Sequence, residues 1–187
     1  MNTSNPQGKG LVPVLTDWQG MQPAMIRRRS AQQVLRDYFV GLLVISAECA
    51  FQPRRGIVYF MYRVKDGWRL SLLSPQDWSI RQPGPLLGEC QLLEDMTWSL
   101  TPAADLAEQP DLLAALEAFQ QGFVEWLDND GTLEDHLPFH VRELPYYRRL
   151  VAAGLARSLK SSMAASGLDA KSSRVWLQTS DLPRLTS

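Results

Sequence analysis

The sequence predicts an α+β protein in which a long N-terminal helix packs on a small antiparallel sheet, followed by a C-terminal helical segment. Three observations carry this prediction: a helically spaced apolar segment comes first, a hairpin pattern follows it, and helical spacing returns after residue 110. We divide the chain into an N-terminal arm at 1–22, an α+β core at 23–109 and a helical extension at 110–187 that packs on the core.

The N-terminal arm is rich in Pro, Gly and Asn, which favours a loop over a regular element. The first helix is expected from Pro23 to about Ala50, because Pro suits a first helical turn and apolar residues then recur at steps of three and four. These apolar residues are Val34, Leu35, Tyr38, Leu42, Ile45 and Cys49.

Four short runs after this helix predict strands, at 57–64, 68–73, 86–93 and 97–100. Asp66-Gly67 separates the first two runs, and this pair is a strong signal for a β-hairpin. After the hairpin, Ser74 and Pro75 predict a capped helical turn with Asp77 in it.

The second half of the chain returns to helical spacing. Pro110 opens a helix that ends at the turn residues 128–131. Pro145 opens a long last helix, for which Gly167 is a natural stop. The run at 174–179 is expected to add an edge strand.

Composition and cysteine usage place the protein in the cytoplasm. Of 187 residues, 45% are hydrophobic and 21% charged, which is typical of a soluble globular domain. No secretory signal pattern opens the chain, and the apolar run at 38–47 is far shorter than the about 20 residues of a membrane span. Cys49 and Cys90 are too few for a disulfide framework, so we expect two reduced thiols and no membrane association.

The net charge of −1 conceals a strong asymmetry along the chain. Residues 93–135 contain eleven acidic residues and no Lys or Arg, whereas residues 1–92 and 136–187 each have a net charge of +5. Two interpretations stay open. The acidic helix lies beside the basic C-terminal helix and the charges neutralise each other, or the acidic stretch is a docking face for a basic partner.

Short motifs between residues 25 and 110 carry a family resemblance. In order they are Tyr59-x-x-Tyr62, Asp66-Gly67, Ser74-Pro75-x-Asp77-Trp78, Pro85-x-Leu87-Gly88 and Asp95-x-x-Trp98. With this ordered set, the sequence resembles a family of bacterial and animal proteins catalogued as a domain of unknown function, number 2452 in its series. The resemblance implies no established activity, cofactor or catalytic residue.

Aromatic and arginine side chains gather around the predicted sheet. The aromatic residues are Tyr59, Phe60, Tyr62, Trp68, Trp78 and Trp98. Helices covering the sheet would make them core, whereas an exposed aromatic face would grip bases or a peptide. The nearby arginines, Arg54, Arg55, Arg63, Arg69 and Arg81, suit a phosphate-bearing ligand. A sequence pI of about 6.1 argues against a nucleic-acid partner.

The basic run Arg27-Arg28-Arg29 falls near the start of the first predicted helix, where positive charge opposes the helix dipole. It is either a docking patch or a solvated face.

No metal site or cofactor is predicted. His136 and His140 have a spacing that can bind metal on a helix, but Pro138 between them breaks the helical register. The run at 128–131 resembles part of a calcium loop, yet the first and last ligand positions of that loop would fall on apolar residues.

Two hypotheses about function follow. The first is a non-enzymatic protein-interaction or binding module that contacts a protein partner, or a second copy, through its charged helices. The second is a small-molecule-binding protein or enzyme with a pocket between the sheet and the N-terminal arm, which requires four charged side chains to meet there. The predicted ligand-binding residues are Arg54, Arg55, Tyr59, Tyr62, Asp77, Trp78, Asp95 and Trp98, and the four charged ones are Arg54, Arg55, Asp77 and Asp95.

Overall fold

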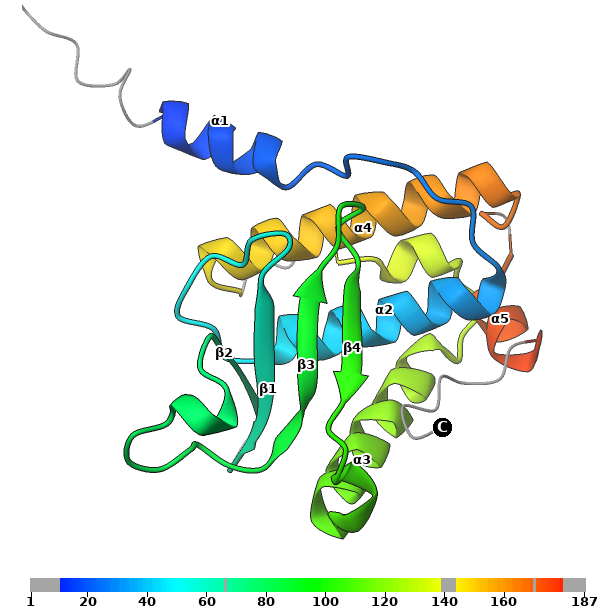
Figure 1. Ribbon diagram of the computed structural model, residues 1–187. Helices are drawn as coiled ribbons and strands as arrows, with labels where there is room; N and C mark the ends of the chain where they lie inside the picture. The colour runs from blue at the N-terminus through cyan, green and yellow to red at the C-terminus, as the bar shows by residue number, and fades with distance from the viewer. Residues whose placement is uncertain (1–10, 66, 139–143, 170, 180–187) are drawn as a thin grey trace, which may run out of the picture.

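A computed structural model describes residues 11–65, 67–138, 144–169 and 171–179 (Figure 1). It confirms the α+β class, with helices and an antiparallel sheet of four strands. The strands are β1 (Val58–Val64), β2 (Gly67–Ser71), β3 (Leu86–Leu92) and β4 (Trp98–Pro102). The α-helices are α1 (Leu11–Gly20), α2 (Ala31–Ser46), α3 (Pro110–Leu127), α4 (Tyr146–Ser166) and α5 (Ser173–Thr179). Short 3-10 turns are η2 (Pro75–Asp77), η3 (Leu106–Glu108) and η4 (Leu133–His136).

The strands lie in the order β2-β1-β3-β4, and each neighbouring pair is antiparallel. The predicted hairpin is confirmed: Met61 pairs with Leu70 and Arg63 with Trp68, while Asp66 in its turn lies outside the described residues. The predicted third and fourth strands are also confirmed, and β4 forms one edge of the sheet.

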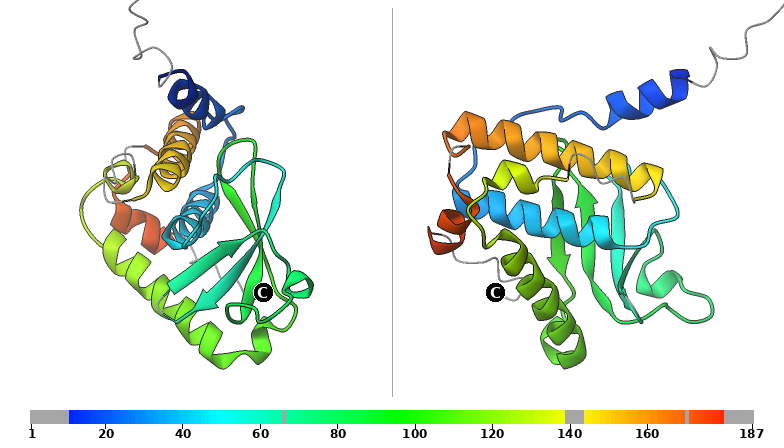
Figure 2. Two further views of the ribbon diagram at one scale, coloured as in Figure 1. Left: turned by 90° about the vertical axis from the view of Figure 1, so that its left-hand side faces the viewer. Right: turned by 180° about the vertical axis from the view of Figure 1, so that it is seen from behind.

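Helices cover one face of this sheet, and α2 lies directly on it (Figure 2). The inward side chains of the sheet, such as Tyr59, Met61, Trp68 and Trp98, are buried in one continuous apolar cluster. The core interpretation is therefore confirmed for Tyr59, Trp68 and Trp98, whereas Phe60 and Trp78 are only partly buried. Helix α2 is itself apolar on most sides because the sheet, α3 and α4 all pack against it.

The first predicted helix begins too early. Helix α2 starts after Ser30, whose hydroxyl accepts a hydrogen bond from the backbone of Gln33 while the Gln33 side chain accepts one from the backbone of Ser30. This capping box sets the first turn. Residues 22–30, which we call the strap, are instead used for tertiary contacts with α4 and the β3–β4 turn.

The expectation of an irregular N-terminal arm was wrong for Leu11–Gly20, which is helix α1. The two residues that suggested a loop, Pro13 and Gly20, occupy the first turn and the last position, where a helix tolerates them. Trp18 attaches this helix to α4, because the Arg157 guanidinium lies 4.9 Å from its ring centroid.

The predicted edge strand at 174–179 was also wrong, since Ser173–Thr179 is helix α5. Ser173 and Trp176 are fully buried, and their spacing of three residues places them on one helical face. The backbone N–H of Ser173 donates to the carbonyl of Gly131, which anchors the start of α5.

The acidic stretch is neutralised within the chain at several points. Arg174 of α5 pairs with Asp128 at 2.9 Å and with Asp130 at 2.8 Å, and Lys160 of α4 pairs with Glu134. These partners follow α3 rather than lying on it. Within the described chain, no ion pair is recorded for the acidic residues of α3 itself, Asp111, Glu117 and Glu125.

None of the helices in the described residues combines the length and the apolar character needed to cross a membrane.

Candidate functional site

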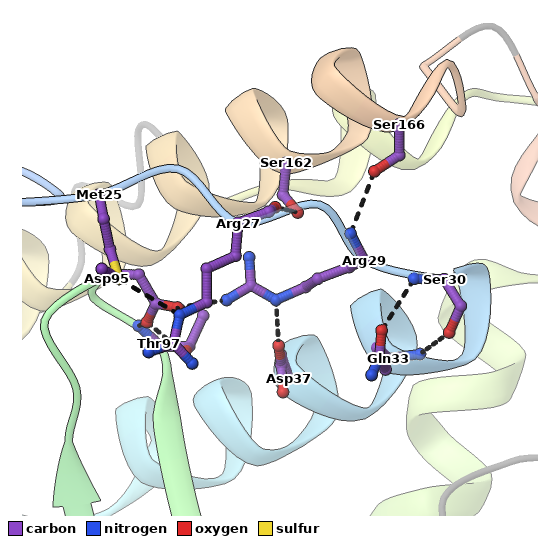
Figure 3. A network of polar contacts seen from close by, with 10 residues as sticks. All are labelled: Met25, Arg27, Arg29, Ser30, Gln33, Asp37, Asp95, Thr97, Ser162 and Ser166. Atoms are coloured by element: carbon purple, nitrogen blue, oxygen red, sulfur yellow. Dashed lines mark hydrogen bonds and ion pairs between the residues drawn. The ribbon is translucent and has the colours of Figure 1, made fainter.

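The strap is fixed at three points, and Figure 3 shows the two of them that lie on α4; of the strap side chains, only Arg29 is buried. The backbone N–H of Ala24 donates to the carbonyl of Glu94 in the β3–β4 turn at 2.9 Å. On α4, the Ser162 hydroxyl donates to the carbonyl of Arg27 at 2.5 Å, and the Ser166 hydroxyl accepts from the N–H of Arg29 at 3.1 Å. The extended strap thus joins α4 to the sheet above α2.

Arg29 is the centre of a buried ionic network. Its side chain is 6% exposed, its Nε donates to Asp37 of α2 at 2.5 Å, and its Nη2 donates to Asp95 at 2.6 Å. Arg27 reaches Asp95 from the solvent side at 3.4 Å. The Nη1 atom of Arg29 is buried and has no hydrogen-bond partner among the described residues.

Asp95 is held as an acceptor in the β3–β4 turn. Its carboxylate accepts hydrogen bonds from the hydroxyl of Thr97 at 2.7 Å and from the N–H of Thr97 at 3.2 Å. Burial opposes ionisation, but the Thr97 hydrogen bonds and the charges of Arg29 and Arg27 outweigh it, so the pKa of Asp95 lies below its ordinary value. For Asp37, burial outweighs the attraction of Arg29 and raises the pKa.

The turn that carries Asp95 is strained at Met96, which has a φ of 67°. This left-handed conformation is costly for a residue other than glycine, and it persists only where packing enforces it. Met96 is completely buried and contacts Gly154 of α4, where an added Cβ would lie 2.6 Å from the Met96 Cε. Close packing between the turn and α4 therefore holds Asp95 in place.

A concave pocket of about 330 Å³ opens beside this network. We call it the arginine pocket; its lining residues are Arg27, Arg28, Arg29, Gln33, Arg36, Asp37, Val40, Leu93, Asp95, Thr97, Trp98, Ser99 and Leu100. Four arginines face two carboxylates, so the pocket has a positive balance. The indole Nε1 of Trp98 is buried and, like Arg29 Nη1, finds no partner among the described residues.

A family model described as a protein of unknown function, DUF2452, matches residues 23–121, just over half of the chain. The chain belongs to the DUF2452 family. The match runs from the strap through α2 and the sheet into α3, so the whole lining of the arginine pocket lies within the DUF2452 region. The resemblance inferred from the sequence motifs is thus confirmed. No solved structure matches the chain.

Two of the eight predicted site residues, Asp95 and Trp98, line the arginine pocket of this DUF2452 protein. The backbone N–H of Arg54 donates to the Tyr59 hydroxyl at 2.7 Å, and this hydroxyl donates in turn to the Arg54 carbonyl. Arg55 donates to the carbonyls of Gly20 and Gln22 and pairs with Glu94 at 3.5 Å. The contacts of Arg55 tie α1 and the strap to the sheet.

The remaining three predicted residues form a separate cluster around η2. Tyr62 donates to the carbonyl of Leu73 at 2.9 Å and accepts from the indole N–H of Trp78 at 3.2 Å. Asp77 caps the turn by accepting from the N–H and hydroxyl of Ser74. The four charged residues of the second hypothesis therefore have separate contacts, and no described contact brings all four together.

The residues that sequence reasoning missed are Arg29, Arg36 and Asp37. The only signal for them was the basic run before the Ser30 cap, which was interpreted as a docking patch or a solvated face. Arg27 and Arg28 are exposed, as both interpretations require, but Arg29 is buried and fits neither of them. Nothing in the spacing of Arg29 and Asp95 shows that they meet.

A larger groove of about 900 Å³ lies between α2, α3 and η4 and is mostly apolar. Its polar residues already have partners: Glu134 pairs with Lys160, Asp135 accepts from Thr132, and the ring of His136 hydrogen-bonds Asn129. Polar groups that already have hydrogen-bond or ion-pair partners contribute little to orienting a bound ligand. The arginine pocket, which has unpaired donors, is therefore the stronger candidate site.

In the described part of the chain, no group of three or more His, Cys, Asp or Glu residues is arranged to hold a metal ion. His140, the second histidine of the spacing considered above, lies outside the described residues. The described lining of the arginine pocket contains neither Cys nor His. Its chemistry is that of fixed cations and hydrogen-bond donors, which suits the binding of an anion.

Proposed function

We propose that this DUF2452 protein is a binding module whose arginine pocket holds an anionic group, a phosphate or a carboxylate. The observation that carries the proposal is the free Nη1 of Arg29. Its other two nitrogens are fixed on Asp37 and Asp95, so Nη1 is a preorganised donor without a partner among the described residues. A buried charged donor without a partner is costly, and an anion oxygen would satisfy it.

Two further arginines support the proposal. Arg28 and Arg36 are exposed, line the same pocket, and take part in none of the ion pairs recorded for the described residues. A ligand anion at Arg29 would therefore meet additional cations near the solvent. The planar guanidinium group matches the oxygens of phosphate and carboxylate in pairs, which is why arginine is favoured at such sites.

The location proposed for this activity is the cytoplasm. Cys49 and Cys90 are both free thiols, which fits a reducing compartment.

The proposal is tested by isothermal titration of the whole chain with sodium phosphate and with sodium succinate at low ionic strength. The Arg28→Gln/Arg36→Gln double variant should bind at least about tenfold more weakly, because charge-assisted hydrogen bonds are lost. Arg29 is left intact because its removal would unpair Asp95. Added salt should weaken binding as well.

The matched control is Arg81→Gln/Arg149→Gln, which removes the same charge from exposed positions outside the pocket. It should bind like the wild type. Equal affinity of the pocket variant and the control, or no saturable binding by the wild type, would contradict the proposal.

A further inference from the structure

We infer that the anion taken by the arginine pocket belongs to an acidic peptide segment, which binds in an extended conformation as an additional strand on the free edge of β4. This inference rests on the proposed anion site and names the class of its ligand. Three features of the molecule support it: the hydrogen-bond register of β4, the position of the pocket, and the charge of the pocket.

The register determines which backbone groups of β4 point away from the sheet. Leu93 N–H donates to the carbonyl of Thr97, and Ala103 N–H donates to the carbonyl of Leu87. In an antiparallel pair, hydrogen-bonded residues alternate with residues whose N–H and C=O point the other way. Ser99 and Thr101 therefore bond to β3, whereas the N–H and C=O groups of Trp98 and Leu100 face the open edge.

This open edge is also a wall of the arginine pocket. Trp98, Ser99 and Leu100 follow one another along β4 and all line the pocket, and Arg36 of α2 lines it from the other side. An extended chain laid along β4 would thus enter the pocket and meet its cations. Figure 1 shows β4 at one edge of the sheet, and none of the described strands lies on its outer side.

The two edges of the sheet differ in whether their outward backbone groups have hydrogen-bond partners. At β2, the edge is covered by the chain itself: Glu48 N–H donates to the carbonyl of Trp68 at 2.7 Å, and Leu70 N–H donates to the carbonyl of Glu48 at 2.9 Å. No comparable bonds to Trp98 or Leu100 are recorded from the described residues. Unpaired edge groups are a template for strand addition, which several peptide-binding domains use.

Charge selects the kind of segment. A strand presents every second side chain on one face, so acidic residues two positions apart would lie together. On that face they would find the Nη1 atom of Arg29 and the exposed Arg36, neither of which has a hydrogen-bonded or ion-pair partner recorded among the described residues. The peptide would also make main-chain hydrogen bonds to Trp98 and Leu100, so it should bind more tightly than free phosphate, which cannot make them.

The test uses fluorescence anisotropy with a fluorescein-labelled, capped peptide Glu-Val-Glu-Val-Glu. Two N-methylated derivatives of this peptide are isomers of each other: one carries methyl groups on both valine nitrogens, and the other on the nitrogens of the last two glutamates. The isomers keep the charge, but each loses the N–H groups of one strand edge. We expect the parent peptide to bind the wild-type protein, and one isomer to lose at least about tenfold in affinity while the other stays close to the parent.

Two protein variants complete the test. The Arg28→Gln/Arg36→Gln variant should bind the parent peptide more weakly than the wild type does, just as it should bind phosphate more weakly. Leu100→Pro removes an outward N–H that β3 does not use. Because Leu100 also lines the pocket, both ligands are titrated, and binding of the peptide should weaken by a clearly larger factor than binding of phosphate. Leu100 is buried, so this variant could fail to fold. In that case the N-methylated peptides still test strand addition, because they need only the wild-type protein.

The outcomes separate the two proposals. If phosphate binds but the parent peptide does not, or both N-methylated isomers bind like the parent, strand addition is overturned while the anion site stands. If neither phosphate nor peptide binds, the anion site fails and strand addition fails with it. Loss of affinity in one isomer only, together with loss in the arginine variant, supports the inference.

Discussion

Arg29 and Asp95, 66 residues apart in the chain, form an ion pair at 2.6 Å in which both side chains are buried. The pair joins the strap before α2 to the turn between β3 and β4. Because the Arg29 backbone also contacts α4, this single residue connects three parts of the fold. The network it centres is both a structural link and the floor of the proposed anion site.

Replacing Asp95 by Ala should be strongly destabilising. The variant leaves the Arg29 charge buried with one carboxylate fewer, and breaking such a pair costs ~3–5 kcal/mol. Urea unfolding of Asp95→Ala and wild type measures the difference. Asp77→Ala, which removes an exposed capping carboxylate, is the control and should cost far less. An equal loss of unfolding free energy in the two variants would show that the buried pair contributes no more to stability than an exposed cap.

The contribution of Asp95 to stability should depend on pH. Its pKa in the folded protein lies below the ordinary value of 3.8, so folding favours the ionised form. The stabilisation is therefore fully present above pH 3.8 and is lost as the pH falls below that value through the folded pKa.

The measurement compares unfolding free energies of wild type and Asp95→Asn between pH 7 and pH 3, and the gap should narrow at the acidic end. Asp37 has a raised pKa, which gives the opposite slope, and the charge of Asp95 contributes to that rise, so the comparison is repeated in an Asp37→Asn background, where residue 37 no longer titrates. A gap that widens as the pH falls would contradict the prediction.

Gly154→Ala should destabilise the protein even though alanine favours helices. A Cβ at this position would lie 2.9 Å from the Met21 carbonyl oxygen and 2.6 Å from the Met96 Cε, and overpacking of this kind costs ~1–3 kcal/mol. Gly122→Ala in α3 is the matched control, because nothing lies within 4 Å of its added Cβ. It should gain ~0.5–1 kcal/mol. Thermal unfolding of both variants tests the opposite signs.

The two thiols should differ in reactivity. Burial raises the pKa of Cys90 to about 12, which leaves almost no thiolate near neutral pH. Cys49 is half-buried and also has a raised pKa, chiefly through burial, so it should react slowly. With a thiol-specific disulfide reagent, Cys49→Ser should show no reaction until denaturant is added. Rapid labelling of Cys90 in the native variant would contradict this.

Short-range signals in the sequence were reliable where one or two residues suffice to specify a turn or cap. The Asp66-Gly67 pair marked the β1–β2 hairpin, and Gly167 ends α4 in the left-handed conformation expected of it. The start of α2 also had a local signal, the capping box of Ser30 and Gln33. It was overlooked because Pro23 offered an earlier start that tertiary contacts of the strap override.

The site could be predicted only in part. Asp95 and Trp98 came from the family-like motifs, and both line the arginine pocket. Arg29 and Asp37 did not, because an arginine in a basic run and an aspartate on a helix are usually solvated. Their burial depends on the packing of the strap between α4 and the β3–β4 turn.

By itself the sequence determined the α+β class, the order of the strands along the chain, the ends of α3 and α4, and the family. These follow from periodicity, turn residues and motifs, which act over a few residues. The tertiary structure alone decided that the strap crosses α2, that Arg29 meets Asp95, and that the outer edge of β4, with which no described strand pairs, lies beside four arginines. Such contacts join distant segments, and their free energy comes from burial and charge pairing that exist only once the chain is folded.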